Sequence, residues 1–128
     1  TNCSFLNMRI LNITSPVDIS NGSWEKSNKD DSHFPNGWMH RKNSENVPME
    51  VTVKCKNLFI ISSANDVPAE ILVTIDEKDP FKITCGAVSG YDRHLIFSSD
   101  TKAEHTVSIK MDDSSISKEF FIYGFGYN

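Results

Sequence analysis

The sequence has no long apolar run and no dense positive charge, and each absence excludes a class of function. Nothing approaches the roughly eighteen consecutive apolar residues of a membrane-spanning helix, so we predict no membrane span. The 128 residues carry a formal net charge of −4, and the densest basic stretch, His40-Arg41-Lys42, is too short to follow a phosphate backbone. We therefore expect no nucleic-acid partner.

Sequence motifs of catalysis are also missing. The chain contains no nucleophile elbow G-x-S-x-G, no phosphate loop, no H-E-x-x-H and no dinucleotide fingerprint. His105 lies in phase with Val107 and Ile109, which favours a half-buried structural histidine over a catalytic one. An enzyme would need His94 or His105 beside a serine or carboxylate in a cleft. We predict that the chain is not an enzyme, although it could accompany a glycan-active one.

The three cysteines, Cys3, Cys55 and Cys85, are too few and too widely spaced for a disulfide framework or a zinc site. Cys55 ends an alternating strand pattern and is expected to be a buried thiol that packs as a small hydrophobe. We favour free thiols, with a Cys55–Cys85 bridge as the alternative.

No metal site is predicted from the acidic residues or from the histidines. Asp112-Asp113 together with Asp100 could supply oxygen ligands for a structural calcium ion, but the dense spacing of a calcium loop is absent. His33 and His40 fall in one loop, which is a weak pattern for metal binding. No cofactor is expected.

What the chain does contain is a set of alternating apolar segments. The clearest is Ala69–Asp76, AEILVTID, in which the β-branched residues Ile71, Val73 and Ile75 fall on one face, as in a strand buried on at least one face. The same character is found in Met49–Cys55, Leu58–Ser62 and Glu104–Met111. Lys56-Asn57 separates the first two of these as in a tight hairpin, although the glycine that such a turn prefers is missing.

Shorter segments complete an all-β pattern without a convincing amphipathic helix. Further strands are expected within Phe5–Ile13, Trp38–Arg41, Phe81–Cys85, Tyr91–Phe97 and Glu119–Phe125, with polar Ser98–Ala103 as a break. About eight or nine short strands at turn-marked intervals predict two antiparallel sheets packed face to face, an antiparallel β-sandwich. We expect residues 1–128 to form a single domain.

The region 21–46 differs from the rest in being polar, with few β-branched residues. It nevertheless contains both tryptophans, Trp24 and Trp38, together with Phe34. Disordered segments rarely keep so many aromatic residues. We therefore predict an ordered loop region that packs on the sandwich.

The order of segments from Met49 to Met111 resembles the galactose-binding-like jelly roll, found as the accessory domain of SGNH-type carbohydrate esterases and in carbohydrate-binding modules. Two short motifs carry the resemblance: Asp76, which ends a strand before a turn, and Glu104-His105-Thr106-Val107, which opens a late strand. Glu77 stands where that family has glycine, and the Gly-Asp-Ser nucleophile motif of the esterases is absent. The resemblance thus implies a jelly-roll topology and the accessory, glycan-binding role without the esterase activity.

Aromatic and planar polar residues form the candidate ligand set. Sugars stack their C–H faces on aromatic rings and offer hydroxyl pairs to Arg, Asp and Asn side chains. The predicted ligand-binding residues are Trp24, Trp38, His40, Arg41, Tyr91, Asp92 and Arg93. The alternative for the tryptophans is that they seal the core. We expect Trp38 to be the more buried and Trp24 to meet the ligand.

The favoured function is a non-catalytic carbohydrate-binding module or a receptor-binding domain that recognises a cell-surface glycan. The alternative is a protein–protein adhesion or assembly domain. It would use the aromatic segment Glu119–Phe125, whose two apolar faces must be covered by another layer of the domain or by a partner subunit. The chain has no signal-peptide pattern and reads as a mature product or an excised domain. Either function places it outside the cell, or on a cell or virion surface.

Overall fold

The computed structural model describes residues 8–29, 31–88 and 90–128, whose regular structure is almost entirely antiparallel β. One short 3-10 turn, η2 (Asp113–Ser115), precedes the last strand. The strands are β1 (Arg9–Leu11), β2 (Asp18–Ser20), β3 (Glu25–Lys26), β4 (Trp38–His40), β5 (Met49–Ala64), β6 (Ala69–Ile75), β7 (Phe81–Cys85), β8 (Asp92–Met111) and β9 (Phe120–Tyr127). The predicted all-β class is confirmed.

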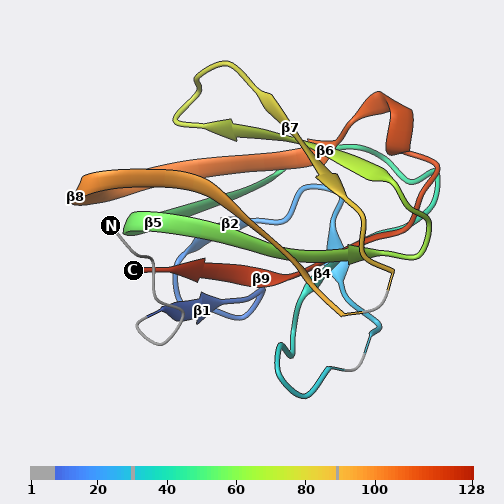
Figure 1. Ribbon diagram of the computed structural model, residues 1–128, viewed down its shortest axis with the longest axis horizontal. Helices are drawn as coiled ribbons and strands as arrows, with labels where there is room; N and C mark the ends of the chain where they lie inside the picture. The colour runs from blue at the N-terminus through green and yellow to red at the C-terminus, as the bar shows by residue number, and fades with distance from the viewer. Residues whose placement is uncertain (1–7, 30, 89) are drawn as a thin grey trace.

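Two long strands, β5 and β8, hold the molecule together (Figure 1). Residues 49–55 of β5 pair with residues 109–103 of β8, and residues 57–62 of β5 pair with 98–92. The order along the sheet is β3-β4-β9-β5-β8-β6-β7, with β2 beside the first half of β5 and β1 beside β9. Because the two halves of β5 have different neighbours, the continuous sheet folds over into the two layers of a jelly-roll sandwich.

Alternation along the strands places one apolar face of each layer in a shared core. The first half of β5 points Met49, Val51, Val53 and Cys55 inward, and Glu50 and Lys54 outward. The same core receives residues from all the larger strands, among them Trp38, Leu58, Ile60, Ile71, Val73, Val107, Ile109, Phe120, Ile122 and Phe125. The alternation predicted for β5, β6 and β8 is confirmed.

Strand β9 is covered on both faces by the chain itself. Phe120 and Ile122 enter the main core, whereas Phe121 and Tyr123 form a second apolar cluster on the opposite face. The segment between β3 and β4 lies over that face, and its Phe34 packs against the cluster. The aromatic strand is therefore covered by another layer of this domain, which is one of the two coverings that its sequence predicts.

The sequence breaks predicted within β5 and β8 are absent. Lys56-Asn57 is a bulge inside β5 rather than a hairpin turn, because the pairing with β8 shifts register there and then continues. The backbone N–H groups of Lys56 and Asn57 donate to the carbonyl oxygen of Asn128 at 2.6 and 3.5 Å. Polar residues 98–103 remain extended within β8. A bulge thus accommodates what the sequence pattern suggested was a turn.

Cys55 and Cys85 are free and buried, so the prediction of free thiols is confirmed for these two, and the alternative bridge is not formed. Burial raises the pKa of both thiols above the ordinary value, which keeps them protonated and unreactive at neutral pH. Cys3 lies outside the described residues.

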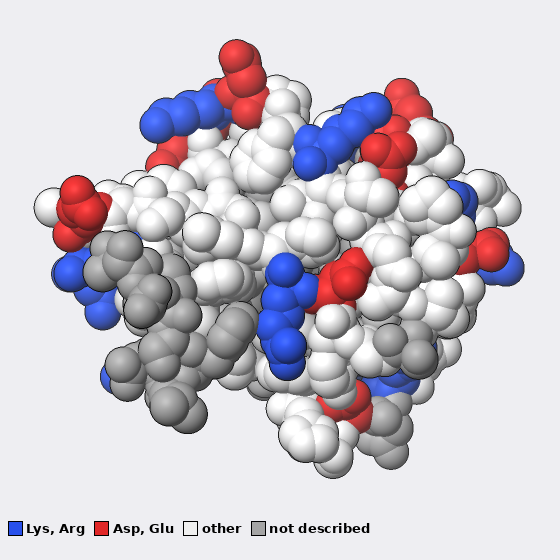
Figure 2. Space-filling model, viewed as in Figure 1, with Lys and Arg blue, Asp and Glu red and all other residues white. Residues whose placement is uncertain are grey.

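The surface mixes charges of both signs. On the face shown in Figure 2, basic and acidic side chains are interspersed and form no broad basic stripe. Among the residues that the structure describes, none belongs to a helix long and apolar enough to span a membrane.

Candidate functional site

Both tryptophans are buried in the structure. The Trp24 side chain is 4% exposed, its indole N–H donates to the carbonyl of Ile109 at 3.2 Å, and its ring lies edge-on to Phe120. Trp38 is fully buried and its indole N–H donates to the Asn21 side-chain oxygen at 2.9 Å. Trp38 is the more buried, as predicted, but the exposure expected of Trp24 is wrong. Neither indole is available for stacking on a sugar, because both seal the core.

His40 and Arg41 do not form a ligand site with them. His40 is buried beside the Trp24 ring, its Nε2 donates to the Ile116 carbonyl at 2.9 Å, and its Nδ1 lies 3.1 Å from the Ser44 hydroxyl. Arg41 is exposed, and its Nε lies 2.8 Å from Glu25 Oε2 in a surface ion pair. The predicted role of His40 in ligand contact fails because both of its ring nitrogens are used inside the fold.

Tyr91, Asp92 and Arg93 lie at a different place, beside the segment between β3 and β4. The Tyr91 hydroxyl donates to the Asp31 carboxylate, and its ring meets Phe34 and Tyr123 edge-on at 4.9 Å each. The hydrogen bond between Tyr91 and Asp31 lowers the pKa of Asp31 and raises the pKa of Tyr91 to about 12. The seven predicted residues are therefore divided among separate locations and do not form one site.

A hollow on the outer face of the sheet does bring together groups that suit a sugar. We call it the sheet-face hollow; its volume is about 330 Å³ and it is lined by Pro48, Leu72, Thr74, Pro80, Ser108 and Lys110. Leu72 pairs with Lys110 across β6 and β8, and Thr74 pairs with Ser108. Two hydroxyls and an ammonium group thus surround an apolar floor, and Lys110 forms no ion pair with any described residue.

None of these residues was predicted as a ligand contact. For the four lining residues on β6 and β8, the signal in the sequence was the outward half of the alternating patterns in AEILVTID and EHTVSIKM, where Leu72 is an apolar residue on an otherwise polar face. Alternation identified the face. It could not show that two strands far apart in sequence would pair to form the hollow.

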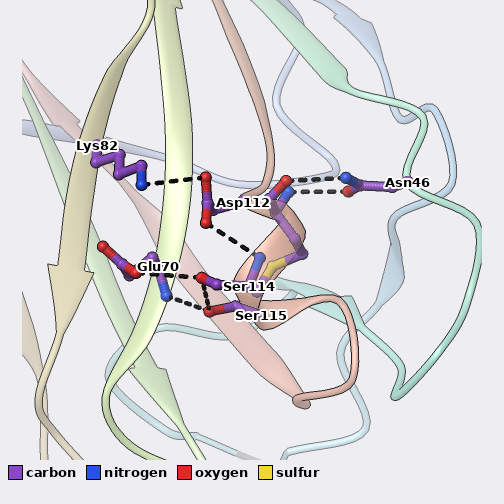
Figure 3. A network of polar contacts seen from close by, with 7 residues as sticks. Asn46, Glu70, Lys82, Asp112, Ser114 and Ser115 are labelled. Carbon is purple, nitrogen blue, oxygen red and sulfur yellow. Dashed lines mark hydrogen bonds and ion pairs between the residues drawn. The ribbon is translucent and has the colours of Figure 1, made fainter.

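A polar network fixes the end of the sheet next to the hollow (Figure 3). The Asn46 side chain bonds the backbone of Met111 twice, accepting from its N–H at 2.9 Å and donating to its carbonyl at 2.8 Å. Met111 follows Lys110, and Asn46 lies two residues before Pro48. The amide of Asn46 therefore holds two walls of the hollow at a fixed separation.

The same network engages the carboxylate considered for calcium. Asp112 lies 3.6 Å from the Lys82 ammonium and accepts from the Ser114 N–H at 3.1 Å, and the contacts with Ser114 lower its pKa. Glu70 is tied to the same turn, since its N–H donates to the Ser115 hydroxyl at 2.9 Å. Within residues 8–29, 31–88 and 90–128, no three His, Cys, Asp or Glu side chains are placed to hold a metal ion.

The two motifs of the family resemblance contact each other. Asp76 accepts from the Thr106 N–H at 2.9 Å, and its other oxygen lies 2.6 Å from His105 Nδ1. The hydrogen bonds from His105 and Thr106 lower the pKa of Asp76, against the opposing effect of burial. Among the residues that the structure describes, His105 Nε2 is buried without a hydrogen-bond partner, and none of their hydroxyls or thiols is paired with it. This Asp–His pair joins the turn after β6 to β8.

The turn at Asp76 also explains the departure from the family pattern. Asp76 and Glu77 have φ of 52° and 61°, and the Lys78 N–H donates to the Ile75 carbonyl at 3.0 Å. Two successive left-handed residues make a tight type I′ turn, in which Asp-Gly is preferred. Glu77 adopts the glycine conformation at some cost in strain, and the turn is kept.

The fold is a jelly-roll sandwich, and comparison with solved structures finds other proteins with the same fold. It superposes on a family two carbohydrate esterase from Cellvibrio japonicus with a TM-score of 0.73 and 15% identity, covering 94% of this chain and 33% of the esterase. A two-domain esterase active on acetylated mannans, crystallised with mannopentaose, superposes with a TM-score of 0.71 and 9% identity. That match covers 94% of this chain and 36% of the esterase. The CBM36-1 domain of a multidomain xylanase from the hindgut metagenome of Trinervitermes trinervoides superposes with a TM-score of 0.66 and 11% identity.

The extent of these matches differs in an informative way. The match covers 95% of this chain and 97% of the CBM36 domain, whereas the chain spans only about a third of each esterase. The predicted likeness to esterase accessory domains and carbohydrate-binding modules is thus confirmed at the level of the fold. No family model matches the sequence, and no curated protein matches it.

Proposed function

We propose that this chain is a non-catalytic carbohydrate-binding module whose glycan lies in the sheet-face hollow. The observation that carries the proposal is the extent of the structural match, which includes nearly the whole of a carbohydrate-binding module but only a third of each esterase. The absence of a carboxylate or histidine among the residues that line the hollow supports binding without catalysis.

The chemistry of the hollow fits one face of a sugar ring. Leu72 with Pro48 and Pro80 offers apolar surface to ring C–H groups, while the hydroxyls of Thr74 and Ser108 can exchange hydrogen bonds with sugar hydroxyls. The Lys110 ammonium supplies three further donors. Because Leu72, Thr74, Ser108 and Lys110 stand on the two paired strands β6 and β8, most of the site is formed before the ligand arrives.

The remaining predicted residues, at two places of their own, give alternative locations for the same function. Arg41 and the Tyr91–Arg93 segment are outside the main core, and Tyr91 presents a half-buried ring beside polar groups. We keep them as an alternative glycan contact. We further propose that the glycan belongs to an extracellular or cell-surface polymer, or to a receptor on such a surface.

Binding to soluble polysaccharides tests the proposal. Titration calorimetry with mannan, xylan, galactan and cellulose oligosaccharides should detect at least one ligand for the wild-type chain. The double variant Thr74→Val/Lys110→Met should lose about tenfold or more in affinity, since each lost hydrogen bond contributes roughly 1 kcal/mol. The matched control Thr84→Val/Lys26→Met changes the same groups at exposed strand positions outside the hollow and should bind normally.

Two outcomes would count against the proposal. A correctly folded wild-type chain that binds none of these glycans would exclude the function. Unchanged binding by the hollow variant, with loss on Tyr91→Ala or Arg93→Ala, would move the site to the Tyr91–Arg93 segment.

A further inference from the structure

A second hollow, at the end of the sandwich where β1, β5, β8 and β9 meet, has a different character. We call it the cationic hollow; its volume is about 380 Å³ and it is lined by Arg9, Val17, Val53, Lys54, Lys102, Tyr127 and Asn128. This volume lies within the usual range of small-molecule sites. Figure 1 shows the C-terminal end of the chain on this side of the molecule.

Positive charge is concentrated there without compensation. Three of the 13 basic residues of an acidic chain line this one hollow, and no acidic side chain does. Arg9, Lys54 and Lys102 form no ion pair with any described residue. A solvated surface of mixed charge does not require such a cluster, since three like charges around one concavity repel each other unless an anion lies between them.

Two acidic side chains near these residues, Glu104 and Asp76, form no ion pair with these cations. Glu104 lies opposite Lys54 across β5 and β8 but makes no ion pair with it. Asp76 is held by His105 and by the Thr106 N–H. The hollow therefore keeps its positive charge available to a ligand.

The other groups of the lining suit a saccharide. The half-buried Tyr127 ring, held opposite Arg9 by the pairing of β9 with β1, offers an aromatic surface, and Val17 and Val53 extend the apolar floor. The Asn128 side-chain oxygen accepts a hydrogen bond from the Asn57 side-chain amide at 2.9 Å, which fixes the orientation of the Asn128 amide. Cations above an aromatic and aliphatic floor match a sugar ring that bears an anionic substituent.

We propose that the cationic hollow is a second binding site and that it takes the carboxylate or sulfate group of an acidic polysaccharide. This proposal rests on the proposed glycan-binding function, because that function gives the class of polymer. It does not depend on a glycan lying in the sheet-face hollow. The chain would then bind a polymer that carries both neutral and anionic sugars through two sites on different faces.

The test measures binding of the wild-type chain to dextran, dextran sulfate and polygalacturonate at increasing salt. Dextran and dextran sulfate share a backbone, so tighter binding of the sulfated polymer shows that the anionic group is recognised. Comparing polygalacturonate with dextran sulfate shows whether the site prefers a carboxylate or a sulfate. At least one acidic polymer should bind, with log K falling against log salt with a slope of up to about −3 if all three cations are neutralised. A chain of net charge −4 has no general attraction for polyanions.

Variants locate the site. Lys54→Ala/Lys102→Ala should lose at least tenfold in affinity for the acidic polymer and reduce the salt slope by about two. Lys26→Ala/Lys42→Ala removes the same net charge from exposed positions outside the hollow and should stay within twofold of wild type.

The proposal is overturned if no acidic polymer binds, if the control variant loses as much affinity as the hollow variant, or if an oligothymidylate binds as tightly as the acidic polysaccharides. Its failure can be told from failure of the proposed function. Binding of neutral glycans that is lost in Thr74→Val/Lys110→Met and retained in Lys54→Ala/Lys102→Ala supports the module while excluding this second site.

Discussion

At the scale of single residues, the tryptophans show how tertiary contacts override local sequence. Trp24 follows a turn and precedes a charged pair, which favoured exposure, but the hydrogen-bond acceptor of its indole is the Ile109 carbonyl, 85 residues away. No local pattern reports such a contact. The prediction for Trp38 succeeded because its segment could be recognised as a strand, and a strand residue has a defined inward or outward face.

Replacement of either indole should destabilise the protein strongly. Trp24→Ala and Trp38→Ala each remove a core ring and leave an N–H acceptor unpaired, and we expect a loss of about 3–5 kcal/mol in the free energy of unfolding. Urea denaturation measures this, and wild-type fluorescence should be blue-shifted and resistant to acrylamide. Phe81→Ala, at a ring that is 38% exposed, is the control and should cost clearly less. A loss below 1 kcal/mol for both tryptophan variants would contradict the burial described above.

Tyr91 gives a second prediction at this scale, through its bond to Asp31. Folding raises the pKa of Tyr91 from 10.0 to about 12, so the folded state holds this proton more tightly than the unfolded state. The stabilisation is complete below pH 10 and is lost as the pH rises from 10 to about 12. Melting temperatures between pH 8 and 12 should fall more steeply for wild type than for Tyr91→Phe, which has no hydroxyl to titrate. Parallel curves would show that this bond does not contribute.

At the scale of elements, the strands were more predictable than their partners. Alternation identified β6 and the face that it buries, yet β6 lies next to the edge strand β7, and the element on which the sheet is organised is β5. Pairing is non-local, and one sequence has no signal for it. For the same reason Leu72 and Lys110 were each visible as outward residues, but the hollow that they line was not.

The turn after β6 provides a test of backbone strain. Glu77 has a φ of 61°, which glycine adopts without the steric cost borne by other residues. Glu77→Gly should therefore stabilise the protein by about 0.5–1 kcal/mol after allowing for the greater freedom of glycine in the unfolded chain. Lys78→Gly, one residue further along, lacks a positive φ and should not stabilise it. Thermal or urea unfolding of the two variants measures the change in stability. Destabilisation by Glu77→Gly would refute the assignment of strain.

At the scale of the whole molecule, acid sensitivity should reflect carboxylates that the fold keeps ionised. The pKa values of Asp31, Asp76 and Asp112 all lie below the ordinary 3.8 in the folded state. Their contribution to stability is present above pH 3.8 and is lost as the pH falls through the lowered values.

Calorimetric melting temperatures should therefore change little between pH 7 and about 5, and then fall below about pH 4. Asp76→Asn should start from a lower melting temperature and fall less steeply, because one of these carboxylates has been removed. Asp66→Asn, whose carboxylate makes no hydrogen bond or ion pair with the described residues, is the control and should follow the wild-type curve. The same acid dependence in Asp76→Asn as in wild type would contradict the role given to its bonds with His105 and Thr106.

The passage of β5 and β8 through both layers also has a kinetic consequence. Met49 pairs with Ile109 and Ser62 pairs with Asp92, so the chain must close loops of very different length to complete one ladder. Each layer has some strands of its own, but both layers are built on β5 and β8, so neither layer is complete before these two strands have paired. Stopped-flow refolding should accordingly be slow for a chain of this size, in the millisecond-to-second range of non-local β topologies. Hydrogen exchange should release the amides of both layers together, as one cooperative unit.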